Sequence, residues 1–412
     1  MRPVHRTLAV VAATGVLALA APAGAAPGSG STIEARAIYL VTLDRGLEPG
    51  AAASAARRAV GAEVTHVYRH ALRGYAARLT PAAAAQLDRT PGVTAVVPDR
   101  PVSIAAQTVP TGIDRVDAEQ SPTAAIDGID TRVDVDVAIV DTGIDLDHPD
   151  LNVYSAGARN CSSGPSADDG NGHGTHVAGT VGALDNGTGV VGVAPGARLW
   201  PVRVLSNSGS GSWSTVICGV DFITANAASI EVANLSLGGG GSDDGNCGFT
   251  NGDLLHQAVC ASVAAGVTYV VAAGNSAADS ATAVPASYDE VITVSALADF
   301  NGQPGGGGAA TCRADEDDTF ANFSNYGPDV DLIAPGVCIL STARGGGLST
   351  LSGTSMASPH VAGAAALYLV NNPSASPADV RTALRSGGNL DWTWPSQDPD
   401  GIQEPLLDAG AL

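Results

Sequence analysis

The chain has 412 residues, of which 45% are hydrophobic and only 15% are charged, so it is long enough to bury a large core and to form two folded units. Its formal net charge is −21, with 41 acidic residues against 20 basic ones. Such an acidic balance argues strongly against binding to nucleic acid.

The first 26 residues have the pattern of a secretory signal peptide. Arg2 and Arg6 precede an apolar stretch of about a dozen residues, which is followed by small residues that suit signal peptidase. The stretch is too short to span a bilayer, and no later segment approaches ~18 uninterrupted apolar residues. We therefore expect a secreted, extracellular protein with no membrane association after signal removal. An N-terminal core helix is the alternative.

Residues 27–105 are predicted to form a small α+β domain. The order of elements is β-α-β-β-α-β, a ferredoxin-like unit, with strands at 37–43, 63–69, 74–80 and 93–98 and helices at 51–60 and 81–90. This segment has nine arginines and six acidic residues, whereas residues 106–412 have nine arginines and thirty-five acidic residues. It contains no cysteine and no acid-base cluster, so we expect it to bind rather than to catalyse.

From residue 133 onward, apolar strands alternate with longer helices, which is typical of a parallel sheet covered by helices on both faces. The predicted strands are 133–140, 198–205, 230–237, 267–274, 290–297 and 330–336, and the predicted helices are 173–184, 214–226, 252–266 and two that begin at 355 and 377. Residues 106–412 are therefore expected to form a doubly wound α/β domain. The Gly-rich and acidic stretch 299–319 is expected to be a surface loop.

The six cysteines are even in number and are never spaced as CxxC, so an exported chain is expected to pair them in three disulfides. Fifteen pairings are possible. Cys247 and Cys260 would close a short local loop, Cys312 and Cys338 would bracket the acidic stretch, and Cys161 and Cys218 are left by elimination.

Polar residues follow the predicted strands, where the loops of a parallel sheet converge. Asp141 comes directly after the strand 133–140 and is either a site carboxylate or the cap of a turn. His173 and His176 open the next helix and share a face, but a zinc site needs a further ligand and the glutamate of an HExxH motif is missing. We expect His173 to be an exposed base and His176 to be packed inside.

Ser355 opens a helix within the stretch "GTSMASPHVAG". A hydroxyl at this position lies at the positive end of the helix dipole, and the backbone N–H of the same residue is free to donate to a developing oxyanion. The same geometry suits a simple helix cap, so this serine alone does not decide between the two. His360 is expected to be a packed helix residue.

Three segments resemble, in order, the signatures of the subtilisin-like serine peptidases, the subtilases: "VAIVDTGID", "GHGTHVAGT" and "GTSMASPHVAG". The resemblance covers the chain from about residue 107 to its end and implies a three-layer subtilisin-like fold with serine endopeptidase activity. It implies that Ser355 is the nucleophile, that His173 moves the proton and that Asp141 orients the imidazolium. Asn275 matches the oxyanion-hole asparagine of the family, next to the N–H of Ser355.

The resemblance also implies that an extended polypeptide substrate adds as a β-strand to a groove. "NLSLGG" resembles one wall of the primary pocket, and "SGSGSWS" resembles a second pairing strand that places an aromatic residue over the fourth subsite. The residues implied in substrate binding are Gly209, Ser210, Gly211, Trp213, Ser236, Leu237, Gly238, Ala272, Ala273 and Gly274. Because none of them is charged, we expect broad specificity for small or apolar P1 residues.

The stretch "ALDNGTGVVGVAP" resembles a loop that holds calcium in several subtilases. The resemblance implies a structural Ca²⁺ and no organic cofactor; the implied ligands are side-chain oxygens of Gln107, Asp150 and Asn186 and carbonyl oxygens of Leu184, Thr188 and Val190. A loop without an ion is the alternative. The acidic segment 313–318 is expected to be solvated rather than to bind a second ion.

Residues 27–105 resemble the subtilase propeptide, an intramolecular chaperone and inhibitor. The resemblance implies self-cleavage near Ala105–Ala106, and the excess of arginine in this segment complements the acidic enzyme. The mature protein is then expected to be a monomer that spans 106–412. Two rival interpretations remain: a catalytically silent binding protein with the subtilase fold, and a metallohydrolase that uses His173 and His176.

Overall fold

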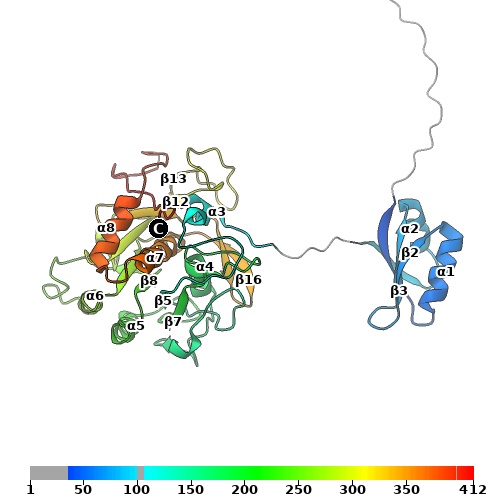
Figure 1. Cartoon of the computed structure of the whole chain (residues 1–412), viewed down its shortest axis with the longest axis horizontal. Coiled ribbons are helices and arrows are strands. Elements are labelled where there is room, and N and C mark those ends of the chain that lie inside the picture. The colour runs from blue at the N-terminus through cyan, green and yellow to red at the C-terminus, as the bar shows by residue number, and fades with distance from the viewer. Residues whose placement is uncertain (1–35, 100–105, 396) are drawn as a thin grey trace, which may run out of the picture. The chain divides into compact units, whose positions relative to one another are not determined.

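The computed structural model describes residues 36–99, 106–395 and 397–412. They form two compact units whose boundary falls between residues 99 and 106 (Figure 1). The predicted signal peptide and the predicted cut after residue 105 lie outside the described residues.

The smaller unit is an antiparallel sheet covered on one face by two helices. Its elements are β1 (Ala37–Leu43), α1 (Pro49–Val60), β2 (Glu63–Tyr68), β3 (Gly74–Leu79), α2 (Pro81–Asp88) and β4 (Val93–Pro98), and the strand order is β2-β3-β1-β4. Glu48 and Thr80 cap the helices by accepting backbone N–H groups, and each helix starts with a proline, whose missing N–H costs nothing there. The β-α-β-β-α-β prediction is confirmed.

The larger unit is built on a mostly parallel sheet with the order β13-β12-β10-β8-β5-β7-β6, in which β14 also pairs with β12. The strands are β5 (Asp136–Asp141), β6 (Arg159–Asn160), β7 (Arg198–Arg203), β8 (Val232–Leu235), β10 (Thr268–Ala272), β12 (Ile292–Ala298), β13 (Thr319–Phe320) and β14 (Leu332–Pro335). Of these pairs only β12 with β13 is antiparallel. The doubly wound α/β prediction is confirmed.

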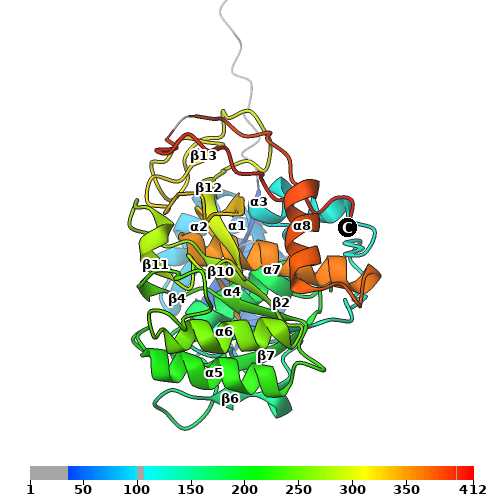
Figure 2. The same cartoon turned by 90° about the vertical axis from the view of Figure 1, so that its left-hand side faces the viewer.

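Helices bury both faces of this sheet. Val137 and Ile139 of β5 share a core with α4 (His173–Gly182) and α7 (Thr354–Asn371), whereas Ala138 and Val140 share a core with α5 (Trp213–Ala225) and α6 (Leu254–Ala264). Figure 2 shows α5 and α6 side by side, and α8 (Pro377–Gly387) packs on α7. Burial on both faces explains why β5 is apolar at consecutive positions. In the part of the chain that the structure describes, no helix is long and apolar enough to cross a membrane.

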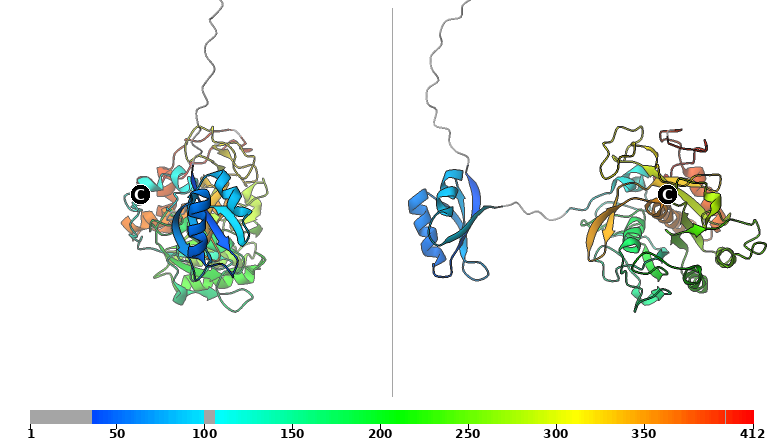
Figure 3. Two further views of the ribbon diagram at one scale, coloured as in Figure 1. Left: turned by 90° about the vertical axis from the view of Figure 1, so that its right-hand side faces the viewer. Right: turned by 180° about the vertical axis from the view of Figure 1, so that it is seen from behind.

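Two local features were not resolved by the sequence. A hairpin of β15 (Ile339–Ala343) and β16 (Gly347–Leu351), orange in the right-hand view of Figure 3, was not expected. Of the segment 208–214, expected to pair with substrate as a second strand, residues 208–212 form no strand with this chain and lead into α5, which begins at Trp213. Its backbone turns because Gly209 has a φ of +75° and donates its N–H to the carbonyl of Ser206, a conformation that favours glycine.

The acidic stretch 299–319 is irregular, as expected, but its aspartates are buried rather than solvated. Asp315, Asp317 and Asp318 are 7%, 5% and 0% exposed. Arg115, at the end of the short helix α3 (Thr111–Arg115), forms ion pairs with Asp299 at 3.3 Å and Asp318 at 2.7 Å. Asp317 and Asp318 also accept backbone N–H groups of the glycine-rich loop. The loop is therefore anchored by its acidic residues.

Three disulfides join Cys161 to Cys218, Cys247 to Cys260 and Cys312 to Cys338. These are the three pairs expected from the sequence, two from their positions along the chain and Cys161–Cys218 by elimination. All three lie in the larger unit, so an oxidising compartment suits this part of the chain.

Arg115→Met is expected to lower the free energy of unfolding of the larger unit by ~3–5 kcal/mol, because it leaves two buried carboxylates without their cation. The control is Arg132→Met, which breaks an ion pair with Asp130 whose side chains are 48% and 37% exposed and whose loss should cost about 1 kcal/mol or less. Denaturant unfolding in a Ser355→Ala background measures both changes. Equal losses in the two variants would contradict a buried role for Arg115.

Candidate active site

Asp141 is the last residue of β5, is completely buried and accepts the N–H of Thr142 at 2.7 Å. The chain then turns sharply at Gly143, which has a φ of +106°. A side chain there would place its Cβ 2.3 Å from the carbonyl oxygen of Ala167, so only glycine fits. This turn leaves the carboxylate facing the first residue of α4.

His173 begins α4, and its Nδ1 lies 2.8 and 2.9 Å from the two carboxylate oxygens of Asp141. A carboxylate only accepts hydrogen bonds, so the proton sits on Nδ1 and Nε2 keeps a free lone pair. The negative charge of Asp141 raises the pKa of His173, and the charge of Asp169 adds to this, although burial acts in the opposite direction. The ring is thus oriented and made more basic.

The other two histidines near the site are not bases. His176 is fully buried and donates its Nε2–H to backbone carbonyls at 3.0 and 3.1 Å, and burial lowers its pKa to about 4. Burial also lowers the pKa of His360 to about 4. Both are packed residues, as the sequence indicated. Among the described residues, the groups of side chains that could hold a metal ion do not include His173 or His176.

Ser355 is the second residue of α7 and lines the same groove as Asn275. Its Oγ donates to the carbonyl of Ser236 at 3.2 Å rather than to His173. Hydrogen bonds of this kind are often long without substrate and shorten in the reacting complex. The structure therefore brings the predicted serine to the groove without joining it to the histidine.

Thr354 orients the side chain of Asn275, which sequence reasoning did not foresee. The Oδ1 of Asn275 accepts the backbone N–H of Thr354 at 2.8 Å and its hydroxyl at 3.0 Å, while that hydroxyl accepts the N–H of Gly274 at 3.1 Å. Because Oδ1 is engaged twice, the Nδ2 of Asn275 is the donor left for a ligand. The threonine immediately before Ser355 in "GTS" was the available signal.

Ser236 ties the first turn of α7 to the end of β8. Its hydroxyl donates to the carbonyl of Ser355 at 2.8 Å and accepts from the Nδ2 of Asn234 at 2.9 Å, and the Oδ1 of Asn234 accepts from Ser358 at 2.7 Å. This chain of hydrogen bonds is buried and satisfied, so it holds the N-terminus of α7 in place.

Two hollows, of about 650 and 370 Å³, lie next to these residues. His173, Gly209, Ser210, Gly211, Trp213, Ser236, Leu237 and Gly238 line the first, and Ala272, Ala273, Gly274, Asn275 and Ser355 line the second together with Leu237 and Gly238. The indole of Trp213 packs over Gly239, where a Cβ would lie 2.7 Å from the ring. All the residues implied in substrate binding thus line one continuous surface.

The residues implied in calcium binding also lie together. Asp150 is 5% exposed, and its carboxylate accepts from the Nδ2 of Asn186 at 2.8 Å and from the N–H of Val190 at 3.0 Å. Gln107 donates to the carbonyl of Leu184 at 3.2 Å, and Thr188 donates to the Oδ1 of Asn186. Carboxylate, carboxamide and carbonyl oxygens form a donor set that fits Ca²⁺.

The fold and the groove together define a serine endopeptidase, a hydrolase of the subtilisin type. A model described as the subtilase family matches residues 133–388, so the chain belongs to the subtilase family. A second model, described as peptidase inhibitor I9, matches residues 39–105. The smaller unit is therefore an inhibitor-type propeptide domain.

Individual relatives agree with this assignment. The chain is 42% identical over 308 residues to an alkaline protease of Alkalihalobacillus alcalophilus, covering 75% of this chain and 72% of the relative. It is 39% identical over 314 residues to subtilisin E of Bacillus subtilis, covering 76% and 74%. Among solved structures, a cold adapted subtilisin-like serine proteinase matches with a TM-score of 0.57 and 35% identity over 73% of this chain and 98% of that one.

The raised pKa of His173 predicts that its imidazole titrates above the ordinary value of 6.5, so the neutral, basic form predominates only above that raised pKa. Asp141→Asn removes the charge that raises the pKa and should move the titration to lower pH. Proton NMR of the imidazole in a Ser355→Ala background measures both values. A titration that Asp141→Asn leaves unchanged would contradict the assigned cause.

Proposed function

We propose that Asp141, His173 and Ser355 hydrolyse peptide bonds as a catalytic triad through an acyl-enzyme. The observation that carries this proposal is the contact of His173 Nδ1 with Asp141, since it leaves Nε2 as an acceptor. His173 lines one hollow, and Ser355 lines the adjoining hollow, which shares Leu237 and Gly238 with the first. Ser355 Oγ attacks the carbonyl carbon while its proton passes to Nε2. The imidazolium, stabilised by Asp141, then protonates the leaving amine.

The tetrahedral oxyanion is stabilised by the Nδ2 of Asn275 and the backbone N–H of Ser355. Support for Asn275 comes from its Oδ1, which Thr354 engages with two hydrogen bonds. A donor fixed before the reaction needs no reorganisation as charge develops on the oxygen. Water then enters and attacks the acyl-enzyme while His173 takes its proton. His173 finally returns a proton to Ser355 Oγ, which releases the acid product.

An extended polypeptide occupies the groove, with small or apolar residues preferred at P1. The hollow beside Ser355 is lined by glycine, alanine and uncharged polar side chains, which supports this preference. In that hollow, a Cβ on Gly274 would lie 2.5 Å from the side chain of Asn325, so the wall is already close packed. No charged group of the lining is available to select a charged side chain.

The chain is made as a preproprotein and matures by its own activity. Residues 1–26 direct secretion, residues 27–105 assist folding and inhibit the enzyme, and residues 106–412 are the mature, monomeric peptidase. The match of the inhibitor model to residues 39–105 supports this order, because the matched segment ends at the expected cut.

A structural Ca²⁺ is held by Gln107, Asp150, Leu184, Asn186, Thr188 and Val190. Burial raises the pKa of Asp150, although hydrogen bonds from Val190 and Asn186 oppose this effect. A nearby cation would therefore stabilise the ionised form of this carboxylate. When bound, the ion would supply positive charge between Gln107, at the start of the mature domain, and the loop after α4. It would thereby hold these two segments together.

Wild type and Ser355→Ala, expressed as full chains, test the nucleophile and self-maturation. We expect the wild type to shorten to a species that begins near Ala106 and to cleave casein, and we expect the variant to keep its propeptide. Mass spectrometry and N-terminal sequencing identify both products. Processing of the variant without added protease, or residual casein cleavage, is the result that would overturn the mechanism.

Asn275→Ala is expected to lower kcat by ~10²–10³ with a small effect on KM. This is the loss that removal of one such donor causes in subtilisin. Thr354→Val removes only the hydroxyl that orients the amide, so its loss of kcat should be smaller and in the same direction. Peptide hydrolysis kinetics measure both. If Thr354→Val raised KM and left kcat unchanged, the hydroxyl would not orient the oxyanion donor.

Asp150→Asn is expected to abolish the stabilisation by Ca²⁺. Ligand binding at about 100 times its dissociation constant adds about 2.7 kcal/mol to the free energy of unfolding, so added Ca²⁺ should raise Tm only in the chain with Asp150 intact. Thermal unfolding in the Ser355→Ala background, with Asp221→Asn as a control for charge, measures the effect. An equal response of both variants to Ca²⁺ would place the ion elsewhere.

A further inference from the structure

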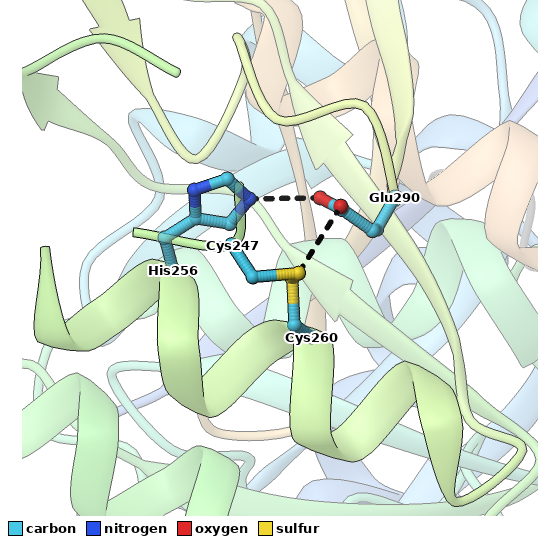
Figure 4. A group of neighbouring side chains, drawn as sticks. All are labelled: Cys247, His256, Cys260 and Glu290. Atoms are coloured by element: carbon cyan, nitrogen blue, oxygen red, sulfur yellow. Dashed lines mark hydrogen bonds and ion pairs between the residues drawn. A yellow bond between two sulfur atoms is a disulfide. The ribbon is translucent and has the colours of Figure 1, made fainter. Parts of the chain in front are cut away.

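A second group of polar side chains lies away from the groove, between the loop after β9 (Gly239–Gly240) and the helix α6. It consists of Asp243 and Asp244 in the loop and His256 on the helix. His256 is 0% exposed, although imidazole is a polar side chain. Figure 4 shows Glu290 beside the ring of His256, with the Cys247–Cys260 disulfide below them.

The ring of His256 is held in one orientation. Its Nε2 lies 2.8 Å from the Oε2 of Glu290, and its plane stacks on Tyr288 with a centroid distance of 3.9 Å and an interplanar angle of 1°. Glu290 can only accept, so Nε2 carries a proton. In the neutral ring, Nδ1 then carries a free lone pair and can only accept.

This Nδ1 has no hydrogen-bond partner among the described residues. It lies 3.7 Å from the Oδ1 of Asp243 and 3.8 Å from the Oδ1 of Asp244. These distances are too long for hydrogen bonds. Two ligands at 2.0–2.2 Å from a tetrahedral metal lie roughly 3.3–3.6 Å apart, only slightly closer than these atoms.

The surroundings favour a cation. In the part of the chain that the structure describes, the ion pairs of Asp243, Asp244 and Glu290 are made with His256 alone. Although burial raises the pKa of Asp244, backbone N–H groups of the loop outweigh it and hold this pKa well below its usual range. Asp244 is thus a fixed anion, and the side chain of Asp243 is 17% exposed, which leaves a path for an ion.

We propose that Asp243, Asp244 and His256 Nδ1 bind a divalent transition-metal ion, with Zn²⁺ as the probe, and that Glu290 orients the histidine from outside the ligand shell. A carboxylate that accepts the other N–H of a metal-binding histidine fixes its tautomer in this way. One imidazole and two carboxylates suit Zn²⁺ better than Ca²⁺, which prefers oxygen ligands alone. Cys247 and Cys260 are not ligands, because their sulfurs are joined to each other.

The competing explanation is an imidazolium at His256, with Nδ1–H facing the two aspartates and no metal. The groups that face the ring are Asp243, Asp244, Glu290 and Tyr288, whose hydroxyl donates to Asp253. Both explanations neutralise the same carboxylates, but only a metal site gives saturable, stoichiometric binding.

The test is titration of the full chain with Zn²⁺ by calorimetry, in the Ser355→Ala background and with excess Ca²⁺ to fill the calcium site. We expect Asp243→Asn and His256→Gln to lose one binding event, and Glu290→Gln to weaken it by ~10–100-fold. Asp221→Asn on the neighbouring helix makes the same charge change as Asp243→Asn and should change nothing. Zinc-edge anomalous diffraction should place the ion beside His256 Nδ1.

Asp243 is partly exposed, so its variant is expected to fold even if the variant of the buried His256 does not. The proposal is overturned if Asp243→Asn binds Zn²⁺ with the same affinity and stoichiometry as its parent. It is also overturned if no Zn²⁺ binds to the parent chain, which is the outcome expected of an imidazolium without a metal. None of these results depends on peptidase activity.

Discussion

The structure depends on one constraint: parallel strands end at a common edge, and polar residues placed just after them must meet there. Asp141 ends β5, Ser236 follows β8, and Asn275 follows β10 by three residues. The helices α4 and α7 begin at the same edge with His173 and Thr354. Residues that are far apart in the chain therefore gather at the ends of regular elements or just beyond them.

The burial of both sheet faces makes this edge rigid. β5 lies between the core that contains α4 and α7 and the core that contains α5 and α6. A strand packed on both sides cannot tilt, so the carboxylate at its end is held to within the freedom of its own side chain. Ser236 and Thr354 then fix the start of α7 and the amide of Asn275 through hydrogen bonds.

The order of strands and helices, the disulfide pairs and the signature motifs were all accessible from the sequence, because each is a local pattern or a short list of choices. The anchoring of the stretch 299–319 was not. It depends on Arg115, a single cation that lies far away in the chain. The sequence around Arg115 indicates only the end of a helix. The hairpin β15–β16 was missed for a related reason, since its strands are short and rich in small polar residues.

The roles of Thr354 and His256 were missed because they depend on which lone pairs are already engaged. Asn275 becomes a donor only because Thr354 engages its oxygen, and His256 exposes a lone pair to two carboxylates only because Glu290 engages its other nitrogen. Donor and acceptor counts of this kind follow from three-dimensional contacts and not from spacing along the chain.

Scarcity of cations links these features. Residues 106–412 have thirty-five acidic residues and nine arginines, and the chain has no lysine. Most buried carboxylates therefore have to be satisfied by other means. Backbone N–H groups serve Asp317, and protonation serves Glu404, where burial raises the pKa to about 8. Where carboxylates converge and stay ionised, as around Asp244, the metal ion that we propose would balance their charge.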